Sequence, residues 1–118
     1  MNRVKPGFTL TSCIACLLFV VFAGVQQPVS GAEMKGEDLV VKNRCYPCHS
    51  KSDMLLGPSY EAIAARHAAN REAMVEVLAE KIIVGGGGNW GVVPMVPNEH
   101  VSREDARRIA RWILKLDK

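Results

Sequence analysis

The spacing of apolar residues along the chain predicts four helices and no convincing strand. Apolar positions recur at helical intervals near residues 36–46, 59–68, 72–83 and 102–116. The last segment is the clearest, because its large side chains follow the i, i+3, i+4, i+7 rule: Ile109, Trp112, Ile113 and Leu116. The pattern therefore predicts an all-α domain.

Two of these segments carry further detail. Ser102 has the residue type of a helix N-cap, and Asp105 follows three residues later, as at the start of a capped helix. In the third segment, Leu78, Ile82 and Ile83 are expected to form the face that packs on the core.

A different apolar pattern occupies the first part of the chain. A mostly apolar run spans residues 10–23, preceded by Arg3 and Lys5, and small residues stand at the cleavage positions that end in Ala32. This order is typical of a secretory signal peptide. We therefore expect residues 1–32 to be a leader cleaved after Ala32, and residues 33–118 to form the domain.

Two other interpretations of the leader stay open. A retained membrane anchor would need about 20 apolar residues, and the run is shorter. A lipid attachment at Cys13 would need the apolar run before that cysteine, whereas here it follows.

Composition and charge change the picture only after the leader is set aside. The 118 residues allow one domain, and removal of Arg3 and Lys5 lowers the formal charge from +3 to +1. So small a charge argues against a nucleic-acid partner. A domain this small has a marginal core, and a bound cofactor is a common way to enlarge it.

A cysteine pair followed by a histidine indicates what that cofactor is. Residues 45–49 read Cys-Tyr-Pro-Cys-His, the pattern of covalent haem attachment. The thiols of Cys45 and Cys48 lie one turn apart and can add to the two vinyl groups of a porphyrin. The imidazole of His49 can then bind the iron. The leader cysteines Cys13 and Cys16 have the same spacing but lack the histidine.

Three other uses of a cysteine pair fit this sequence less well. A thioredoxin-like dithiol belongs to a βαβ unit, and no strand-like alternation flanks this pair. A zinc site needs two more ligands at suitable spacing, and only His67 and His100 remain. A disulfide across two residues closes a tiny loop and adds little stability.

Three ordered motifs and the last helix make the chain similar to the small class I c-type cytochromes of the bacterial cytochrome c-551 type. The motifs are residues 45–49, Leu-Gly-Pro-Ser-Tyr at 56–60, and Asn-Trp-Gly-Val-Val-Pro-Met-Val-Pro-Asn at 89–98. The resemblance covers residues 34–117. It implies a class I cytochrome c fold of about four helices around one haem c, bound through two thioether bonds.

The resemblance also implies roles for individual residues. The carbonyl of Pro58 would accept a hydrogen bond from His49, the iron ligand. Trp90 would point toward a haem propionate, although packing against the haem edge is an equally good interpretation. The family crosses its terminal helices, which makes Leu39 and Val40 partners for Trp112. This chain departs from the family at Arg44, where glycine is common.

The second axial ligand is expected to be Met95. It lies between Pro94 and Pro97, after four consecutive glycines, in a segment that cannot be helix or central strand. The resemblance places the distal methionine here too. Met95 as a loop-packing residue, or a second histidine as ligand, stay as alternatives. The less suitable candidates are Met34, Met54, Met74, His67 and His100.

These residues predict a periplasmic one-electron carrier rather than an enzyme. No Ser/His/Asp set or acidic pair is apparent for catalysis, and no small-molecule substrate is implied. We expect a monomer that meets redox partners through a small apolar patch at the haem edge, and membranes only through partner complexes. A haem enzyme or gas sensor with an open distal site is the alternative.

The last helix carries a stripe of basic residues spaced by four: Arg103, Arg107, Arg111 and Lys115. Such a stripe can dock an acidic partner. We favour a solvated outer face.

Overall fold

The structure, a computed structural model, describes residues 33–116 and contains the four predicted helices. They are α1 (Gly36–Lys42), α2 (Tyr60–Arg66), α3 (Arg71–Val84) and α4 (Arg103–Leu114). Within the described residues there is no strand, and the backbone forms one isolated bridge between Gly86 and Met95. The all-α prediction is confirmed. The predicted leader lies outside the described residues.

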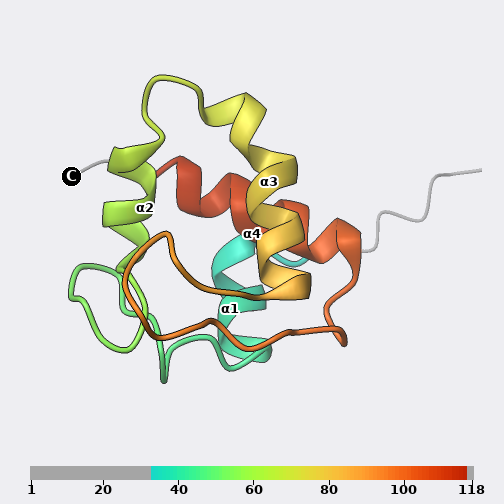
Figure 1. The fold of residues 1–118 in the computed structure, drawn as a ribbon. Helices are drawn as coiled ribbons and strands as arrows, with labels where there is room; N and C mark the ends of the chain where they lie inside the picture. The colour runs from blue at the N-terminus through green and yellow to red at the C-terminus, as the bar shows by residue number, and fades with distance from the viewer. Residues whose placement is uncertain (1–32, 117–118) are drawn as a thin grey trace, which may run out of the picture. The chain divides into compact units, whose positions relative to one another are not determined.

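Helix α4 is the centre of the fold, and each of the other helices packs against it (Figure 1). Its buried face consists of Ala106, Ile109, Ala110, Ile113 and Leu114. The helix begins where the sequence predicted, because the hydroxyl of Ser102 accepts a hydrogen bond of 3.1 Å from the backbone N–H of Asp105. None of the helices in residues 33–116 is long and apolar enough to cross a membrane.

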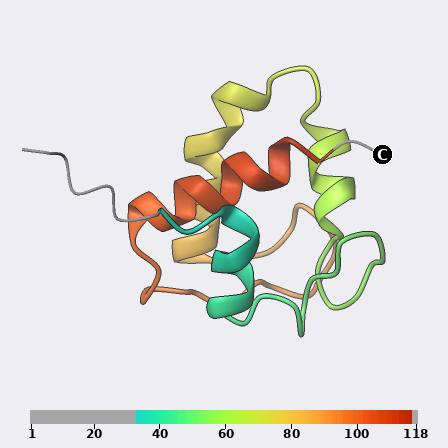
Figure 2. The same cartoon turned by 180° about the vertical axis from the view of Figure 1, so that it is seen from behind.

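Helix α1 crosses α4 at close range (Figure 2). The contact depends on Gly36, since a Cβ atom there would overlap the Cβ of Trp112 and lie 2.7 Å from the carbonyl oxygen of Arg108. Leu39 and Val40 are fully buried in the cluster against which Trp112 packs, as predicted. The third helix also presents its expected face, with Ile82 buried and Leu78 and Ile83 packed on the cluster.

The end of α1 differs from the prediction, because the helix stops at Lys42 rather than near residue 46. The N–H of Arg44 donates to the carbonyl of Val41 (3.1 Å), and the N–H of Cys45 donates to the carbonyl of Val40 (3.0 Å). Together with a φ of 56° at Arg44, these bonds form a Schellman motif. The motif fixes the direction in which Cys45 leaves the helix.

Arg44 occupies a left-handed conformation that favours glycine, so Arg44→Gly is expected to stabilise the protein. The left-handed region costs a non-glycine residue about 1–2 kcal/mol, and Arg44→Gly removes this cost. Against this gain, glycine loses more chain entropy on folding, which costs about 0.5–1 kcal/mol. We expect a net gain of about 0.5–1 kcal/mol in the free energy of unfolding, measured by denaturant titration. Arg44→Ala removes the same charge but keeps Cβ. An equal gain in that control would assign the effect to charge.

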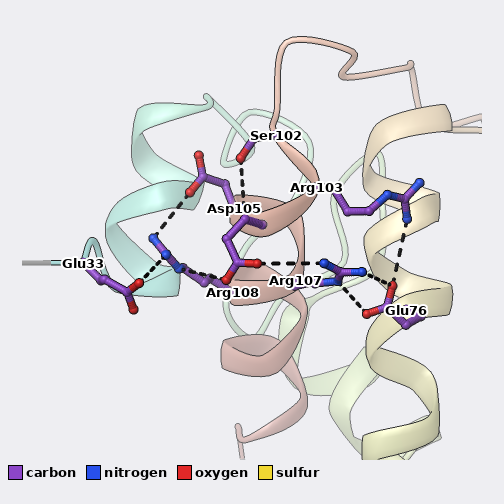
Figure 3. Close-up of polar contacts among 8 residues, drawn as sticks. Glu33, Glu76, Ser102, Arg103, Asp105, Arg107 and Arg108 are labelled. Carbon is purple, nitrogen blue, oxygen red and sulfur yellow. Dashed lines mark hydrogen bonds and ion pairs between the residues drawn. The ribbon is translucent and has the colours of Figure 1, made fainter.

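The basic stripe on α4 is partly neutralised by α3, which the sequence pattern did not reveal. Arg107 donates to both carboxylate oxygens of Glu76, at 2.6 and 3.1 Å (Figure 3). Arg103 lies 2.5 Å from Glu80. The bond from Arg107 holds the pKa of Glu76 below its ordinary value. Half of the stripe therefore pairs with α3, and its side chains stay at the solvent-exposed surface, as the solvated-face interpretation expects.

Arg108 extends from α4 in another direction. Its guanidinium lies 2.6 Å from the carboxylate of Glu33, just before α1 (Figure 3). It also approaches Glu104 and Asp105 on its own helix. Arginines of α4 thus form ion pairs with the segments on both sides. Such exposed pairs contribute little stability singly, and the buried apolar contacts dominate.

Candidate haem-binding site

The cysteine pair forms a single helical turn directly after the Schellman motif. The carbonyl of Cys45 accepts hydrogen bonds from the N–H groups of Cys48 (3.2 Å) and His49 (3.0 Å). Both thiols are free and half-buried. Burial raises the pKa of the Cys45 thiol, and the neighbouring Cys48 raises it further. A redox dithiol needs a lowered thiol pKa, so this environment is opposite to the one that the dithiol alternative requires.

His49 is held in one orientation by the segment that follows it. Its ring is 8% exposed, and its Nδ1 atom lies 2.7 Å from the carbonyl oxygen of Pro58. A carbonyl only accepts, so Nδ1 carries the proton and donates. In the neutral ring this tautomer leaves the lone pair on Nε2, which is the form that binds a metal.

Gly57 packs closely against the His49 ring. A Cβ atom at this position would overlap Cε1 of His49 and come within 2.9 Å of both ring nitrogens. The backbone N–H of Gly57 donates to the carbonyl of Cys48 at 2.8 Å, which ties this segment to the cysteine turn. The Gly-Pro pair therefore supports the histidine through one close contact and one hydrogen bond.

Tyr60 ends the motif at 56–60, but its role was not predicted: it links His49 to the helix core. Its ring is 2% exposed and stacks on His49 with centroids 5.7 Å apart and planes at 18°. It also meets Tyr46 and Trp112 edge to face, at 5.9 and 5.2 Å. Burial raises the pKa of Tyr60, so it stays a neutral phenol. The aromatic residue at the start of a predicted helix, soon after Pro58, was the available indication.

Met95 lies in the second long loop, where the backbone fixes it in place. The N–H of Gly86 donates to the carbonyl of Met95 (2.8 Å), and the N–H of Met95 donates to the carbonyl of Gly86 (3.1 Å). Gly85 has φ of 72°, and a Cβ there would overlap the Met95 carbonyl. The Met95 side chain is half-buried and packs on the same core cluster as Cys45.

Asn98, the last residue of the motif at 89–98, is a second residue whose role was not predicted, and it fastens the end of this loop. Its side-chain amide donates to the carbonyls of Ile82 and Val96, both at 3.0 Å, and its backbone N–H donates to Ile83 at 2.9 Å. Because Ile82 and Ile83 belong to the last turn of α3, the loop is tied to a rigid helix. An asparagine directly after Pro97 was the only indication in the sequence.

Trp90 lies on the same loop, five residues before Met95, and is 36% exposed. The guanidinium of Arg66 sits 4.7 Å from the centre of its ring. The structure shows no contact that decides between propionate hydrogen bonding and packing against the haem edge, so the role of Trp90 stays a prediction.

The loops that carry His49 and Met95 also expose large apolar side chains. Both loops run along the same end of the helices in Figure 1. Their exposed members are Met54, Leu55, Leu56, Val92, Val93 and Val96, with Val92 97% exposed. An apolar surface of this kind indicates a ligand or partner. Together with two free thiols and the free Nε2 of His49, it fits an apolar porphyrin.

The other candidate ligands lie in less suitable places. His67 is the C-cap of α2, His100 and Met54 are exposed, and Met74 packs on a separate small cluster formed by Val75, Ala110 and Leu114. In residues 33–116, no three His, Cys, Asp or Glu side chains come together as a metal site. The zinc alternative therefore has no ligand set in the described part of the chain.

Comparison with known proteins establishes the family, although no family model matches. The chain is 41% identical over 95 residues to cytochrome c-552 of Nitrosomonas europaea, covering 80% of this chain and 91% of that protein. It is 42% identical over 81 residues to cytochrome c-551 of Allochromatium vinosum, covering 67% of this chain and 85% of that one.

Solved structures agree. The crystal structure of the Nitrosomonas europaea cytochrome c552 matches with a TM-score of 0.65 and 43% identity, covering 69% of this chain and 99% of that one. A class 1 cytochrome, MtoD of Sideroxydans lithotrophicus, shares the fold at 23% identity and a TM-score of 0.52. The chain therefore belongs to the small class I c-type cytochromes of the c-551/c-552 type, which are electron carriers with a covalently attached c-type haem rather than enzymes.

Proposed function

We propose that this protein is a periplasmic one-electron shuttle whose haem is bound by Cys45 and Cys48 and ligated by His49 and Met95. The hydrogen bond between His49 Nδ1 and the Pro58 carbonyl is the observation that carries the proposal. It leaves Nε2 as the free nitrogen, in a ring that cannot turn because Gly57 and Tyr60 pack against it.

Each residue of the site has a distinct task. The sulfurs of Cys45 and Cys48 form thioether bonds that prevent loss of the cofactor, while Pro58 orients His49 and increases its basicity. The bound haem supplies the one-electron chemistry, as its iron changes between the ferric and ferrous forms. Met95 provides a thioether ligand that favours the reduced form.

The two loops keep this ligand set unchanged during electron transfer. Met95 is held by its bridge to Gly86, and Asn98 ties the loop to α3. His49 is held by Pro58 and Gly57 on the other loop. Because backbone groups make most of these ties, neither ligand needs to move when the charge on the iron changes.

The exposed apolar side chains of the two loops form the proposed contact surface for redox partners. Val92, Val96 and Met54 are uncharged and at least 68% exposed. A small apolar patch is suited to brief encounters between electron carriers. We expect a monomer that meets respiratory partners such as a bc1-type complex and a terminal oxidase or nitrite reductase.

Residues 1–32 are the proposed export signal. The basic residues Arg3 and Lys5 followed by an apolar run are typical of an export signal. Cleavage after Ala32 would release the domain into the periplasm.

Absorption and mass spectra of the mature protein test this proposal. We expect a ferrous α-band typical of thioether-linked haem and a weak ferric band at the red end from sulfur ligation. The mass should equal that of residues 33–118 plus one haem. Rapid carbon monoxide binding without the red-end band would favour the open-site alternative, and a larger mass would contradict cleavage after Ala32.

A further inference from the structure

Arg66 makes two contacts with the glycine-rich loop, defined here as residues 85–91. Its Nη1 atom donates to the carbonyl oxygen of Asn89 at 2.8 Å, and its guanidinium lies over the ring of Trp90, 4.7 Å from the centroid. A planar guanidinium can lie over an aromatic face while an N–H at its edge donates a hydrogen bond, and an ammonium group lacks this planar fork. Arg66 is the last residue of α2, so a helix end holds the loop.

The loop needs such a tie because its own backbone favours mobility. Gly86, Gly88 and Gly91 all have positive φ, and a Cβ added at Gly88 or Gly91 would meet no atom within 4 Å. The Gly86–Met95 bridge anchors one end of this open segment. Arg66 provides an anchor farther along, at residues 89 and 90.

We infer that Arg66 is a positioning residue, which holds Trp90 and the glycine-rich loop against α2 and thereby raises the reduction potential of the protein. This inference rests on the proposed haem site and on the expected place of Trp90 beside the haem, at a propionate or against the haem edge. Loss of the tie admits water to that edge and also removes a positive charge. Both changes favour the ferric form, because burial and nearby charge set haem potentials.

The test compares Arg66→Ala and Arg66→Lys in the haem-loaded protein by amide hydrogen exchange and potentiometry. Removing the stack and the charge-assisted bond should speed exchange of residues 86–91 about tenfold, given ordinary strengths for the two contacts. The potential should fall in the same variant. Arg66→Lys keeps the charge but loses the planar fork, so its exchange should still rise and its potential should fall less.

Arg111→Ala serves as the matched control, because Arg111 is an exposed arginine on α4, and both measurements should stay at their wild-type values. Unchanged loop exchange in Arg66→Ala would overturn the inference. Faster exchange with an unchanged potential would also overturn it, since the tie would then be structural only. The red-end ferric band should persist in every variant. Its absence from the wild-type protein would instead count against the proposed His/Met ligation.

Discussion

Replacing Gly57 with alanine is expected to displace His49 and disrupt the haem site. The new Cβ would overlap Cε1 of the ring and crowd both nitrogens, so the imidazole must move away from the Pro58 carbonyl. Overpacking costs about 1–3 kcal/mol, and a broken buried hydrogen bond costs about 1–3 kcal/mol more. The loss, on the order of 3 kcal/mol, is a large part of the stability of a small domain.

Two measurements check this expectation. Denaturant titration of the haem-loaded variant should show the lower free energy of unfolding, and its absorption spectrum should lose the features of strong axial ligation. Gly87→Ala is the matched control, because the φ of Gly87 lies outside the left-handed region and a Cβ there would meet Pro94 at ordinary contact distances of 3.4 Å or more. A Gly57→Ala protein with the wild-type spectrum and the wild-type denaturation midpoint would contradict this prediction. It would show that the backbone at residue 57 can shift to make room for the new Cβ without displacing His49.

Much of the fold could be predicted because its determinants are local in the sequence. Helix α4 has a serine cap at the expected residue, and Ile109 and Ile113 of its predicted apolar face are buried, although the helix ends at Leu114, before Leu116. The Cys-x-x-Cys-His motif is likewise one helical turn long, so its spacing alone places Cys45 and Cys48 together. In each case the residues that determine the local structure lie within a short stretch of the chain.

Contacts between segments that the family resemblance did not specify were not predictable. Tyr60 stacks on a histidine eleven residues earlier, and Asn98 binds the carbonyl of Ile82 on the preceding helix. The pairing of Arg107 with Glu76 depends on how α3 lies against α4. A helical sequence pattern describes one helix at a time. It therefore indicated a basic stripe on the last helix but not the acidic partners of that stripe on α3.

The early end of α1 was missed for a different reason. Helices usually end with glycine or asparagine in the left-handed position, but here that position holds Arg44, with φ of 56°. An arginine gives no warning of a helix end. The family's common glycine at this place, noted as a departure, was the one indication that the backbone turns here.

Replacing Met95 with alanine is expected to abolish the red-end ferric band and lower the reduction potential. The thioether sulfur favours the ferrous form, so its loss stabilises the ferric form. Axial ligands set haem potentials over a span of roughly 0.8 V, and we expect a fall on the order of 100 mV. Absorption spectroscopy and potentiometry of the haem-loaded protein measure the two effects, and carbon monoxide should bind the variant readily.

Met74→Ala separates ligation from packing. Met74 is also half-buried, but it packs on the cluster of Val75, Ala110 and Leu114. This control should lose stability, as truncated core methionines do, while it keeps the band and the potential. A red-end band that survives in Met95→Ala would show that Met95 is not the sulfur ligand. Because the bridge to Gly86 uses only backbone atoms of Met95, the loop can keep its path in the variant, and loss of the band then reports the missing sulfur itself.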